Sequence, residues 1–201
     1  MEPFTVHSGL MAPLRRSDVD TDQIIPARYC TNPTRTGYAD GLFADWRQDP
    51  RFVLERPEHQ GVTVLVAGEN FGSGSSREAA VWALQNYGFR AVIARRFGDI
   101  FRANALMSGL LAVTQPAQVV EELWQAAENM PRSPVTVDLQ RLELRWGGRV
   151  EPFDLDADAR QRLLAGLDPI AATLRFEEEI ARYEAGRRPA LPTSLTTGPA
   201  S

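Results

Sequence analysis

The feature that most constrains this chain is an apolar run followed directly by a glycine-rich loop and a helical pattern. Val62–Ala67 is short, rich in β-branched residues and apolar on both faces, which is typical of a strand buried on both sides. The loop covers residues 68–78. Apolar residues then recur at helical spacing as far as Tyr87, and Gly88 stands where a C-terminal cap belongs. The sequence therefore predicts a strand, a loop and a helix in succession.

The loop before this helix has the composition of an anion-binding site. The first amides of a helix have no partners within the helix, and they point outward with the positive end of the helix dipole. Gly72 and Gly74 let the backbone approach a ligand closely. Ser75, Ser76 and Arg77 add two hydroxyls and a fork of donors suited to a carboxylate or a phosphate. These residues predict an oxyanion site.

A purely structural role for the serines is the alternative. Ser75 is followed three residues later by Glu78, which is the spacing of a capping box. Familiar glycine motifs do not fit, because Arg77 stands where a dinucleotide fingerprint has its third glycine. The ending of a phosphate-binding P-loop and the Gly-x-Ser-x-Gly nucleophile elbow are both missing from the sequence. The local pattern leaves anion binding and helix capping open, and the two roles can coexist.

Charge and cysteine content narrow the classes of function. A formal charge of −4 argues against general binding to nucleic acid or acidic membranes, which needs a basic face. Cys30 is the single cysteine, so the chain cannot form an internal disulfide or hold an iron–sulfur cluster or a structural zinc site alone. With only His7 and His59, a histidine-based metal site is disfavoured. The N-terminus lacks signal-peptide features and no apolar run approaches a membrane span, so we expect a cytoplasmic protein.

Two segments before the central strand carry further candidate residues. After a strand expected over Phe4–Leu14, three aspartates alternate with other residues at 18–22, without the glycine and glutamate of a calcium loop. Turn and cap formation is therefore favoured there. Residues 29–41 are rich in breakers and predict a long exposed loop. Arg35 in this loop is a candidate anion contact, with a solvated arginine as the simpler alternative.

The rest of the chain alternates between short apolar runs and helical patterns, which is typical of a parallel α/β architecture. Asn104 is a candidate ligand contact, and an exposed helix residue is the simpler interpretation. From Arg187 onward the composition predicts a disordered tail. The expected strands are 91–94, 110–114, 135–139, 142–146 and 149–153, and a glycine turn joins the last two. The expected helices are 97–107, 116–129, 156–166 and 169–185. In the first of these helices Ile100, Phe101 and Leu106 are expected on or near one face, and in the second Trp124 is expected in the core.

Four motifs in this order resemble one known family, that of 3-isopropylmalate dehydratase small subunits within the aconitase superfamily. The likeness extends from about Phe4 to Tyr183, and two departures are visible. Family members commonly have cysteine at the position of Ser73 and His-Ala-Pro at positions 79–81, and neither change touches residues 75–77. The motifs are Asp-Thr-Asp-Gln-Ile-Ile-Pro at 20–26, Thr-Arg-Thr-Gly at 34–37, Asn-Phe-Gly-Ser-Gly-Ser-Ser-Arg-Glu at 70–78 and Arg-Phe-Gly-Asp-Ile-Phe-Arg-Ala-Asn at 96–104.

The resemblance implies an α/β fold, the swivelling β/β/α domain of aconitase-like enzymes. This would be a single domain over residues 1–186 with a flexible substrate loop, followed by a disordered tail at 187–201. It also implies a hydro-lyase, active only with a large subunit, that isomerises 2-isopropylmalate to 3-isopropylmalate by dehydration and rehydration in leucine biosynthesis. This chain would bind no cofactor or metal itself, and a four-iron, four-sulfur cluster is expected on the large subunit. Neither nucleic acid nor membrane is expected as a partner.

Carried onto this sequence, the resemblance implies that Ser75 is the catalytic base. Ser76 and Arg77 would bind a substrate carboxylate, with Arg35 and Thr36 contributing from the loop at 30–37. Two alternatives stay open, a related hydro-lyase small subunit acting on homoaconitate or methyl-substituted malates, and a noncatalytic anion-binding module. Supporting roles fall to Gly72, Gly74, Asp20, Thr21, Asp22 and Asn104.

Overall fold

The computed structural model describes residues 1–31, 34–75 and 77–187 of the chain. It divides into two compact units, Met1–Asp168 and Pro169–Ser201, which are considered separately. The tail predicted to be disordered lies outside the described residues except for Arg187. None of the helices in the described part of the chain is long and apolar enough to cross a membrane.

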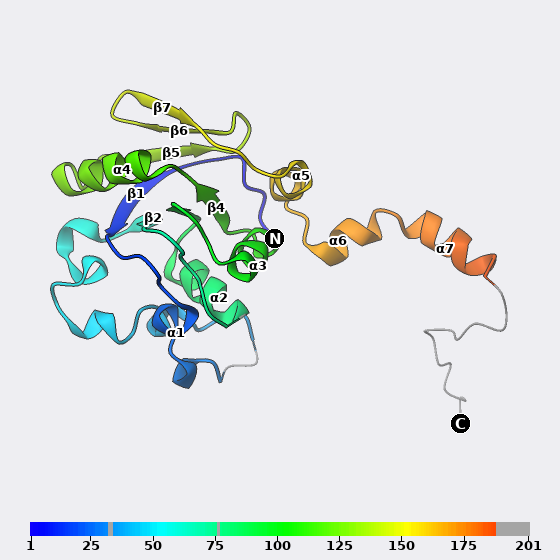
Figure 1. Ribbon diagram of the computed structural model, residues 1–201. Helices are drawn as coiled ribbons and strands as arrows, with labels where there is room; N and C mark the ends of the chain where they lie inside the picture. The colour runs from blue at the N-terminus through cyan, green and yellow to red at the C-terminus, as the bar shows by residue number, and fades with distance from the viewer. Residues whose placement is uncertain (32–33, 76, 188–201) are drawn as a thin grey trace. The chain divides into compact units, whose positions relative to one another are not determined.

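The first unit is a mixed α/β domain built on one seven-stranded sheet of described residues, with strand order β4-β3-β2-β1-β5-β6-β7 (Figure 1). Strands β1 to β4 pair in parallel, whereas β5, β6 and β7 continue from β1 in antiparallel pairs. The strands are β1 (Val6–Leu14), β2 (Val62–Ala67), β3 (Ala91–Ala94), β4 (Leu111–Thr114), β5 (Val135–Asp138), β6 (Glu143–Trp146) and β7 (Arg149–Pro152).

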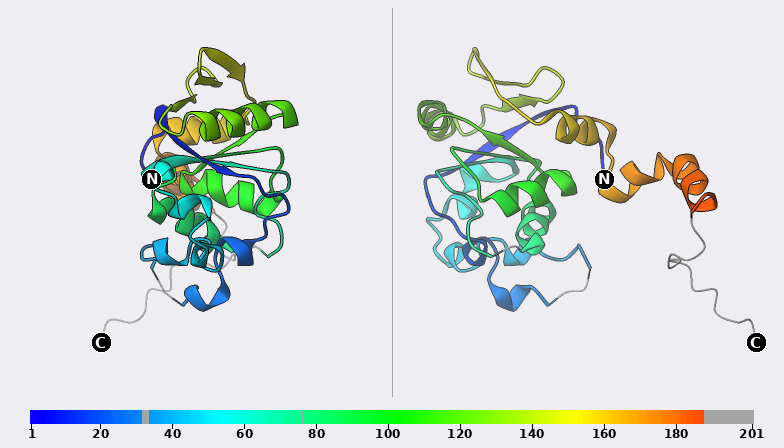
Figure 2. Two further views of the ribbon diagram at one scale, coloured as in Figure 1. Left: turned by 90° about the vertical axis from the view of Figure 1, so that its left-hand side faces the viewer. Right: turned by 45° about the vertical axis from the view of Figure 1, so that its right-hand side comes forward.

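Helices cover the parallel part of the sheet on its two faces. The helices α2 and α3 pack together on one face, and α4 lies against β1 and β2 on the other (Figures 1 and 2). The helices of this unit are α1 (Thr21–Ile24), α2 (Glu78–Tyr87), α3 (Asp99–Ser108), α4 (Ala117–Asn129) and α5 (Ala157–Ala165), with short 3-10 helices at Ala27–Tyr29, Ala39–Gly41, Trp46–Gln48, Val53–Glu55 and Pro57–His59.

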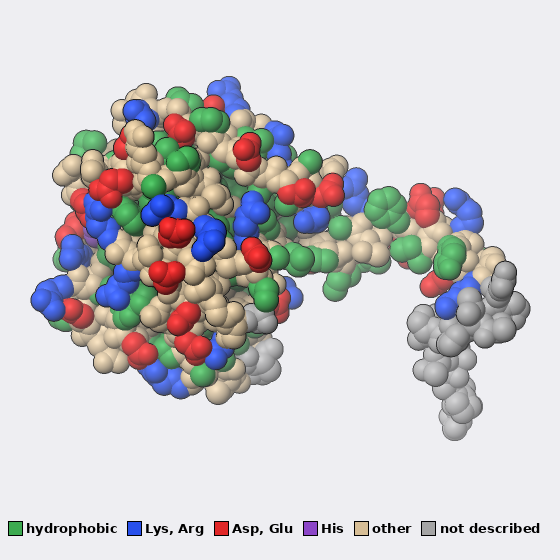
Figure 3. Space-filling view, in the orientation of Figure 1, with side chains coloured by type: hydrophobic (Ala, Val, Ile, Leu, Met, Phe, Trp, Pro, Cys, Tyr) green, Lys and Arg blue, Asp and Glu red, His purple; other side chains and the backbone are tan. Residues whose placement is uncertain are grey.

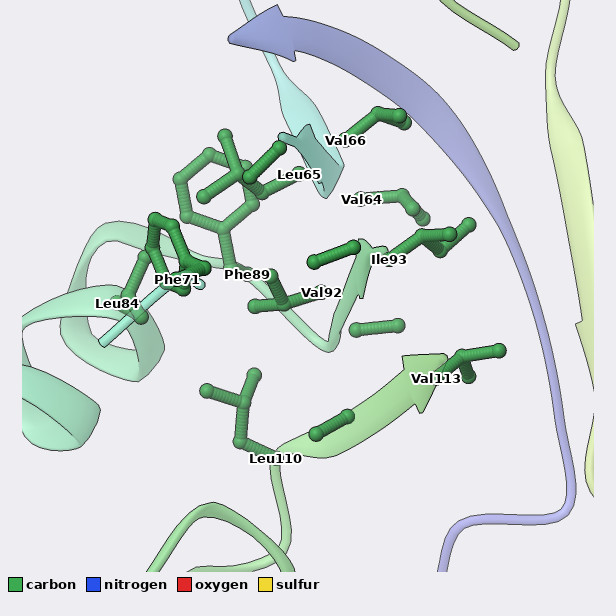
Figure 4. Close-up of a cluster of buried hydrophobic side chains, with 14 of the residues drawn as sticks. Val64, Leu65, Val66, Phe71, Leu84, Phe89, Val92, Ile93, Leu110 and Val113 are labelled. Carbon is green, nitrogen blue, oxygen red and sulfur yellow. The ribbon is translucent and has the colours of Figure 1, made fainter. Parts of the chain in front are cut away.

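The core lies between β2, β3 and β4 and the helices. Val64, Val92 and Ile93 are fully buried, as the uninterrupted apolar runs predicted, and Leu84 of α2 approaches Phe71 beside them (Figure 4). On the opposite face Trp124 of α4 packs partly buried against the core, as predicted, and its Nε1 donates to the Val66 carbonyl at 2.8 Å. The parallel strands are therefore buried on both faces, and their carboxyl ends form one edge of the sheet.

Two expectations about helices were wrong. Ile100 was expected on or near the apolar face of α3, but it is 52% exposed, because Phe101, Ala105 and Leu106 form the buried stripe and Ile100 is rotated away from it. The single helix expected over 169–185 is divided into α6 (Pro169–Leu174) and α7 (Glu177–Ala185). Thr173 accounts for the break, since its hydroxyl bonds back to the Pro169 carbonyl and its own carbonyl accepts from Phe176 N, three residues on.

Charged side chains of both signs are interspersed on one face of the first unit. On the face shown in Figure 3, arginine side chains alternate with aspartate and glutamate side chains, and neither kind gathers in one large patch. Arg15 illustrates the pattern, because its guanidinium bonds both Glu121 and Glu128 on α4.

Candidate active site

The loops that follow β1, β2 and β3 lie side by side at the carboxyl edge of the parallel strands. Residues 15–21 and 68–74 are joined by main-chain hydrogen bonds, among them Gly72 N to the Val19 carbonyl at 2.7 Å and Thr21 N to the Ser73 carbonyl at 3.0 Å. Residues 95–98, which follow β3, form main-chain hydrogen bonds with the other side of the loop at 68–74. In open α/β sheets this edge is where ligands bind. The loop that sequence analysis singled out is thus placed where such a fold carries its site.

Gly72 makes the close packing of these loops possible. Its φ of +75° is unfavourable for other residues, and a Cβ built on it would lie 2.2 Å from Phe101 Cγ in α3. Gly98 is similarly constrained, since a Cβ there would lie 2.5 Å from the Gly72 carbonyl oxygen. The rings of Phe71, Phe97 and Phe101 support the loop from below in mutual edge and stacked contacts. Gly72 therefore acts by fixing the course of the loop.

Ser75 is exposed at the end of this loop, and Thr21 holds it. The Thr21 hydroxyl donates to the Ser75 carbonyl at 3.0 Å and lies 3.2 Å from Ser75 Oγ. A hydroxyl has one hydrogen, so while Thr21 donates to the carbonyl, the contact between the two oxygens must use the Ser75 hydrogen. Thr21 itself is 2% exposed, which makes it a fixed support for an exposed serine. Gly74, at a φ of +88°, lies against Asp20 and Thr21.

The capping-box interpretation of Ser75 was wrong. The helix α2 begins at Glu78 and its N-cap is Arg77, which has extended backbone angles and makes no side-chain capping bond. Ser75 thus lies two residues before the cap, and its carbonyl accepts a bond from Arg77 N at 2.9 Å. The Ser75 hydroxyl therefore has no role in capping α2. Ser76 lies outside the described residues.

Arg77 is oriented by a carboxylate on another loop. Its Nη1 forms an ion pair with Asp22 Oδ1; the Arg77 side chain is 29% exposed and that of Asp22 is 57% exposed. Asp22 is held in place because Asp20 caps α1 in a capping box with Gln23, as the turn-forming composition predicted. One edge of the guanidinium is thereby fixed, and a second side of the fork can still meet a ligand.

The loop residue Arg35 lies beside the middle and the last turn of α2 and not at its first turn. The Arg35 guanidinium carbon is 5.6 Å from the centre of the Trp82 ring, and the Arg35 carbonyl accepts a bond from Asn86. Thr36 bonds Thr34 within the loop. Sequence analysis missed Trp82 and Asn86, because an aromatic and an amide on an amphipathic helix carry no signal of what they touch.

Asn104 is half-buried in the second turn of α3, on a different helix from the one that follows Ser75. Its assignment to the site stays a prediction. Within residues 1–31, 34–75 and 77–187, no group of three or more histidine, cysteine, aspartate or glutamate side chains is placed to hold a metal ion. The loop thus carries an exposed hydroxyl at Ser75 and, two residues later, a guanidinium fixed by Asp22, groups that suit proton transfer and carboxylate binding.

Comparison with known proteins shows the family of this chain. Residues 1–118 match the family model of the aconitase C-terminal domain. A 3-isopropylmalate dehydratase small subunit of Acidothermus cellulolyticus is 62% identical over 94% of this chain and 96% of its own length. One of Thermobifida fusca is 57% identical over 96% of this chain and all of its own length. The crystal structure of 3-isopropylmalate dehydratase from Methanocaldococcus jannaschii matches with a TM-score of 0.65 and 28% identity, over 89% of this chain and 99% of that one.

Proposed function

This chain belongs to the aconitase C-terminal domain family and to its branch of 3-isopropylmalate dehydratase small subunits, and from this premise we propose how its residues contribute to the reaction. It works as the small subunit of a hydro-lyase in leucine biosynthesis, together with a large subunit. The reaction removes water from 2-isopropylmalate and returns it with the hydroxyl on the neighbouring carbon, giving 3-isopropylmalate. A cytoplasmic location is part of the proposal.

Ser75 is the base in this proposal, and the observation that carries it is the exposed hydroxyl held by Thr21. Ser75 is exposed, and its Oγ lies 3.2 Å from a buried Thr21 hydroxyl. In the dehydration step the deprotonated Ser75 oxygen takes the proton from the substrate carbon next to the one that carries the hydroxyl. The carbon–carbon double bond forms as the hydroxyl departs. In the rehydration the hydroxyl adds to the carbon that lost the proton, and a proton adds to the carbon that lost the hydroxyl. Serine is a very weak acid, so the alkoxide needs nearby positive charge and a site from which water is excluded.

Arg77 supplies a fixed positive charge two residues after Ser75 and binds a substrate carboxylate in this proposal. Its planar fork can keep the bond to Asp22 with one nitrogen and present the others to the carboxylate. The same positive charge stabilises the negative charge that spreads onto the carboxylate as the proton leaves. An Arg77→Lys variant keeps the charge but loses the fork, so it is expected to weaken substrate binding more than the rate of the bound complex.

The metal centre that the family implies does not fit this chain. Cys30 is the single cysteine, and iron–sulfur clusters of this kind need several thiolate ligands. We therefore assign the four-iron, four-sulfur cluster to the large subunit, where it would act as the Lewis acid for the departing hydroxyl. This chain's own part is to bind and orient the substrate and to move the proton at Ser75.

The test is to reconstitute the chain with its large subunit and to measure dehydration of 2-isopropylmalate and of a methyl-substituted malate, beside hydration of homoaconitate. The proposal expects turnover with 2-isopropylmalate and loss of turnover in Ser75→Ala, with assembly preserved in gel filtration. A preference for a tricarboxylate would contradict the assignment of 2-isopropylmalate as the substrate. A Ser75→Ala variant that keeps most of the turnover would contradict the role of the serine and favour a noncatalytic anion-binding module.

A further inference from the structure

A side-chain amide on α2 grips the main chain of the loop that carries Arg35. Asn86 Nδ2 donates to the Arg35 carbonyl at 3.1 Å, and Asn86 Oδ1 accepts from Tyr38 N at 3.1 Å. Asn86 is thus bonded to two backbone groups three residues apart, about 50 positions away in the sequence. A backbone segment held at both a carbonyl and an amide has a defined position relative to the helix.

The ring of Trp82 completes the contact one helical turn earlier. The Arg35 guanidinium carbon lies 5.6 Å from its centre, and the Tyr38 ring, which is 2% exposed, lies at the same centroid distance with a 54° tilt. Trp82 Nε1 is buried and has no hydrogen-bond partner among the described residues. The indole therefore contributes its face and not its donor, as in a cation–π contact with Arg35.

We propose that Asn86 and Trp82 are positioning residues that latch the loop at 34–38 onto α2 and so set the position of Arg35 relative to Arg77. This inference rests on the proposed function and adds to it. Arg77 is the N-cap of α2 and Trp82 follows five residues later, which places the two about 7.5 Å apart along the helix axis at 1.5 Å per residue. Arg77 at the start of α2 and Arg35 on the loop bonded to α2 give two guanidinium groups, which suit a substrate with two carboxylates, and the latch fixes the spacing between them.

The chemistry of the latch requires an amide at position 86. An amide offers a donor and an acceptor together, whereas a carboxylate is an acceptor only. In Asn86→Asp the bond to Tyr38 N can persist, but a carboxylate oxygen would face the Arg35 carbonyl. In Asn86→Ala both bonds are lost. The two variants therefore separate the bond that holds Arg35 from the bond that holds Tyr38.

The kinetic test uses the reconstituted two-subunit enzyme with 2-isopropylmalate. If a substitution lowers the population of the latched state by some factor, the apparent affinity for the substrate falls by that factor. The loss of one hydrogen bond lowers that population roughly tenfold. We expect KM to rise about tenfold in Asn86→Asp and more in Asn86→Ala, while kcat changes by less than about threefold. Gln85→Ala is the matched control, because Gln85 Nε2 bonds the Ser108 carbonyl at 2.8 Å and makes no bond to the described loop residues 34–38. Its KM is expected to equal that of the parent.

A double-mutant cycle and an exchange measurement separate the latch from a general loss of structure. In an Arg35→Ala background, Asn86→Asp should raise KM no further, because the residue it positions is gone. In the full-length chain, NMR should show faster exchange of the Tyr38 amide in Asn86→Ala, and unchanged exchange in Asn86→Asp and Gln85→Ala.

Three results would overturn the inference: an unchanged KM in both Asn86 variants, an equal rise in Gln85→Ala, or full additivity with Arg35→Ala. The proposed function is tested separately by Ser75→Ala. If Ser75→Ala loses turnover while the Asn86 variants behave as the parent does, only the latch is refuted. If Ser75→Ala keeps its turnover, the assignment of the base fails whatever the Asn86 variants do.

Discussion

The support that Thr21 gives to Ser75 can be tested by replacing Thr21 with valine. Thr21→Val keeps the β-branched shape and removes the hydroxyl, so it deletes the 3.0 Å bond to the Ser75 carbonyl and the 3.2 Å contact with Ser75 Oγ. The main-chain bond from residue 21 to the Ser73 carbonyl is retained. The substitution therefore changes how Ser75 is oriented without changing the course of the loop.

The structure predicts a small effect on stability and a larger one on the rate. The Ser75 carbonyl keeps its bond from Arg77 N, and Ser75 is exposed to water that can replace the lost partner. The cost in unfolding free energy is then about 1 kcal/mol, near the middle of the range for one intramolecular hydrogen bond. For a chain of this size that lowers Tm by about 2–4 °C. A base that is no longer held in its reactive orientation is expected to lower kcat by about 10- to 100-fold.

The assay is the ultraviolet absorbance of the alkene formed from 2-isopropylmalate by the reconstituted enzyme, with Tm measured on the isolated chain. Thr21→Ser is the matched control, because it restores a hydroxyl at the same position and should recover most of the rate. A Thr21→Val enzyme with the kcat of the parent would refute the role of Thr21 in orienting Ser75. A Thr21→Ser enzyme as slow as Thr21→Val would refute it as well.

Three further predictions concern the surroundings of the site. Gly72→Ala forces a Cβ to within 2.2 Å of Phe101 Cγ at a φ of +75°, so urea denaturation should show a loss of about 2–5 kcal/mol; an unchanged midpoint would contradict the packing. Asp22→Asn should raise KM several-fold by releasing one edge of Arg77 and change unfolding by less than about 1 kcal/mol, since Asp22 is exposed; an unaltered KM would exclude that role. Burial lowers the pKa of His59 below its ordinary value, so the folded chain binds that proton more weakly than the unfolded chain. Stability should therefore fall as pH drops below about 6.5. His59→Gln should make this fall shallower in a series of melting curves. An unchanged dependence of Tm on pH in that variant would contradict the contribution of His59.

The elements of the fold could be predicted because they follow from short-range patterns. Val62–Ala67 was predicted with the bounds that β2 has, since a run of six residues, five of them apolar and four of them β-branched, is typical of a strand buried on both faces. Gly88 was predicted as the cap of α2 and has the left-handed conformation that such a cap needs. Gly147 and Gly148 likewise form the predicted turn with positive φ at both positions.

The details of the site could be predicted only in part, because they depend on contacts between distant parts of the chain. The spacing of Ser75 and Glu78 matches a capping box, yet Ser75 is held by Thr21, 54 residues away, and the helix begins three residues after it. The extended backbone of Arg77 keeps the serine out of the helix. Nothing in the local pattern distinguishes these two outcomes.

The hydrogen bonds between Asn86 and the loop could not be predicted from the sequence either. Asn86 is one polar residue in the last turn of a helix, and its two partners lie 48 and 51 positions earlier. A periodicity argument places it on a helix face but cannot say what lies opposite. The composition of the loop at 29–41 predicted an exposed, functional segment, and the structure adds how residues 34–38 of it are held.

The most direct test of the central claim is the rate at which Ser75→Ala removes the carbon-bound hydrogen of 2-isopropylmalate. The substrate is labelled with deuterium at that carbon, and the release of the label to solvent is followed in the assembled enzyme. Ser73→Ala serves as the control, since it removes a serine hydroxyl from the same loop at a position without an assigned role. The account predicts that Ser75→Ala binds the substrate normally but releases the label about 10²- to 10⁴-fold more slowly, with Ser73→Ala close to the parent. Release by Ser75→Ala at the parental rate would contradict it.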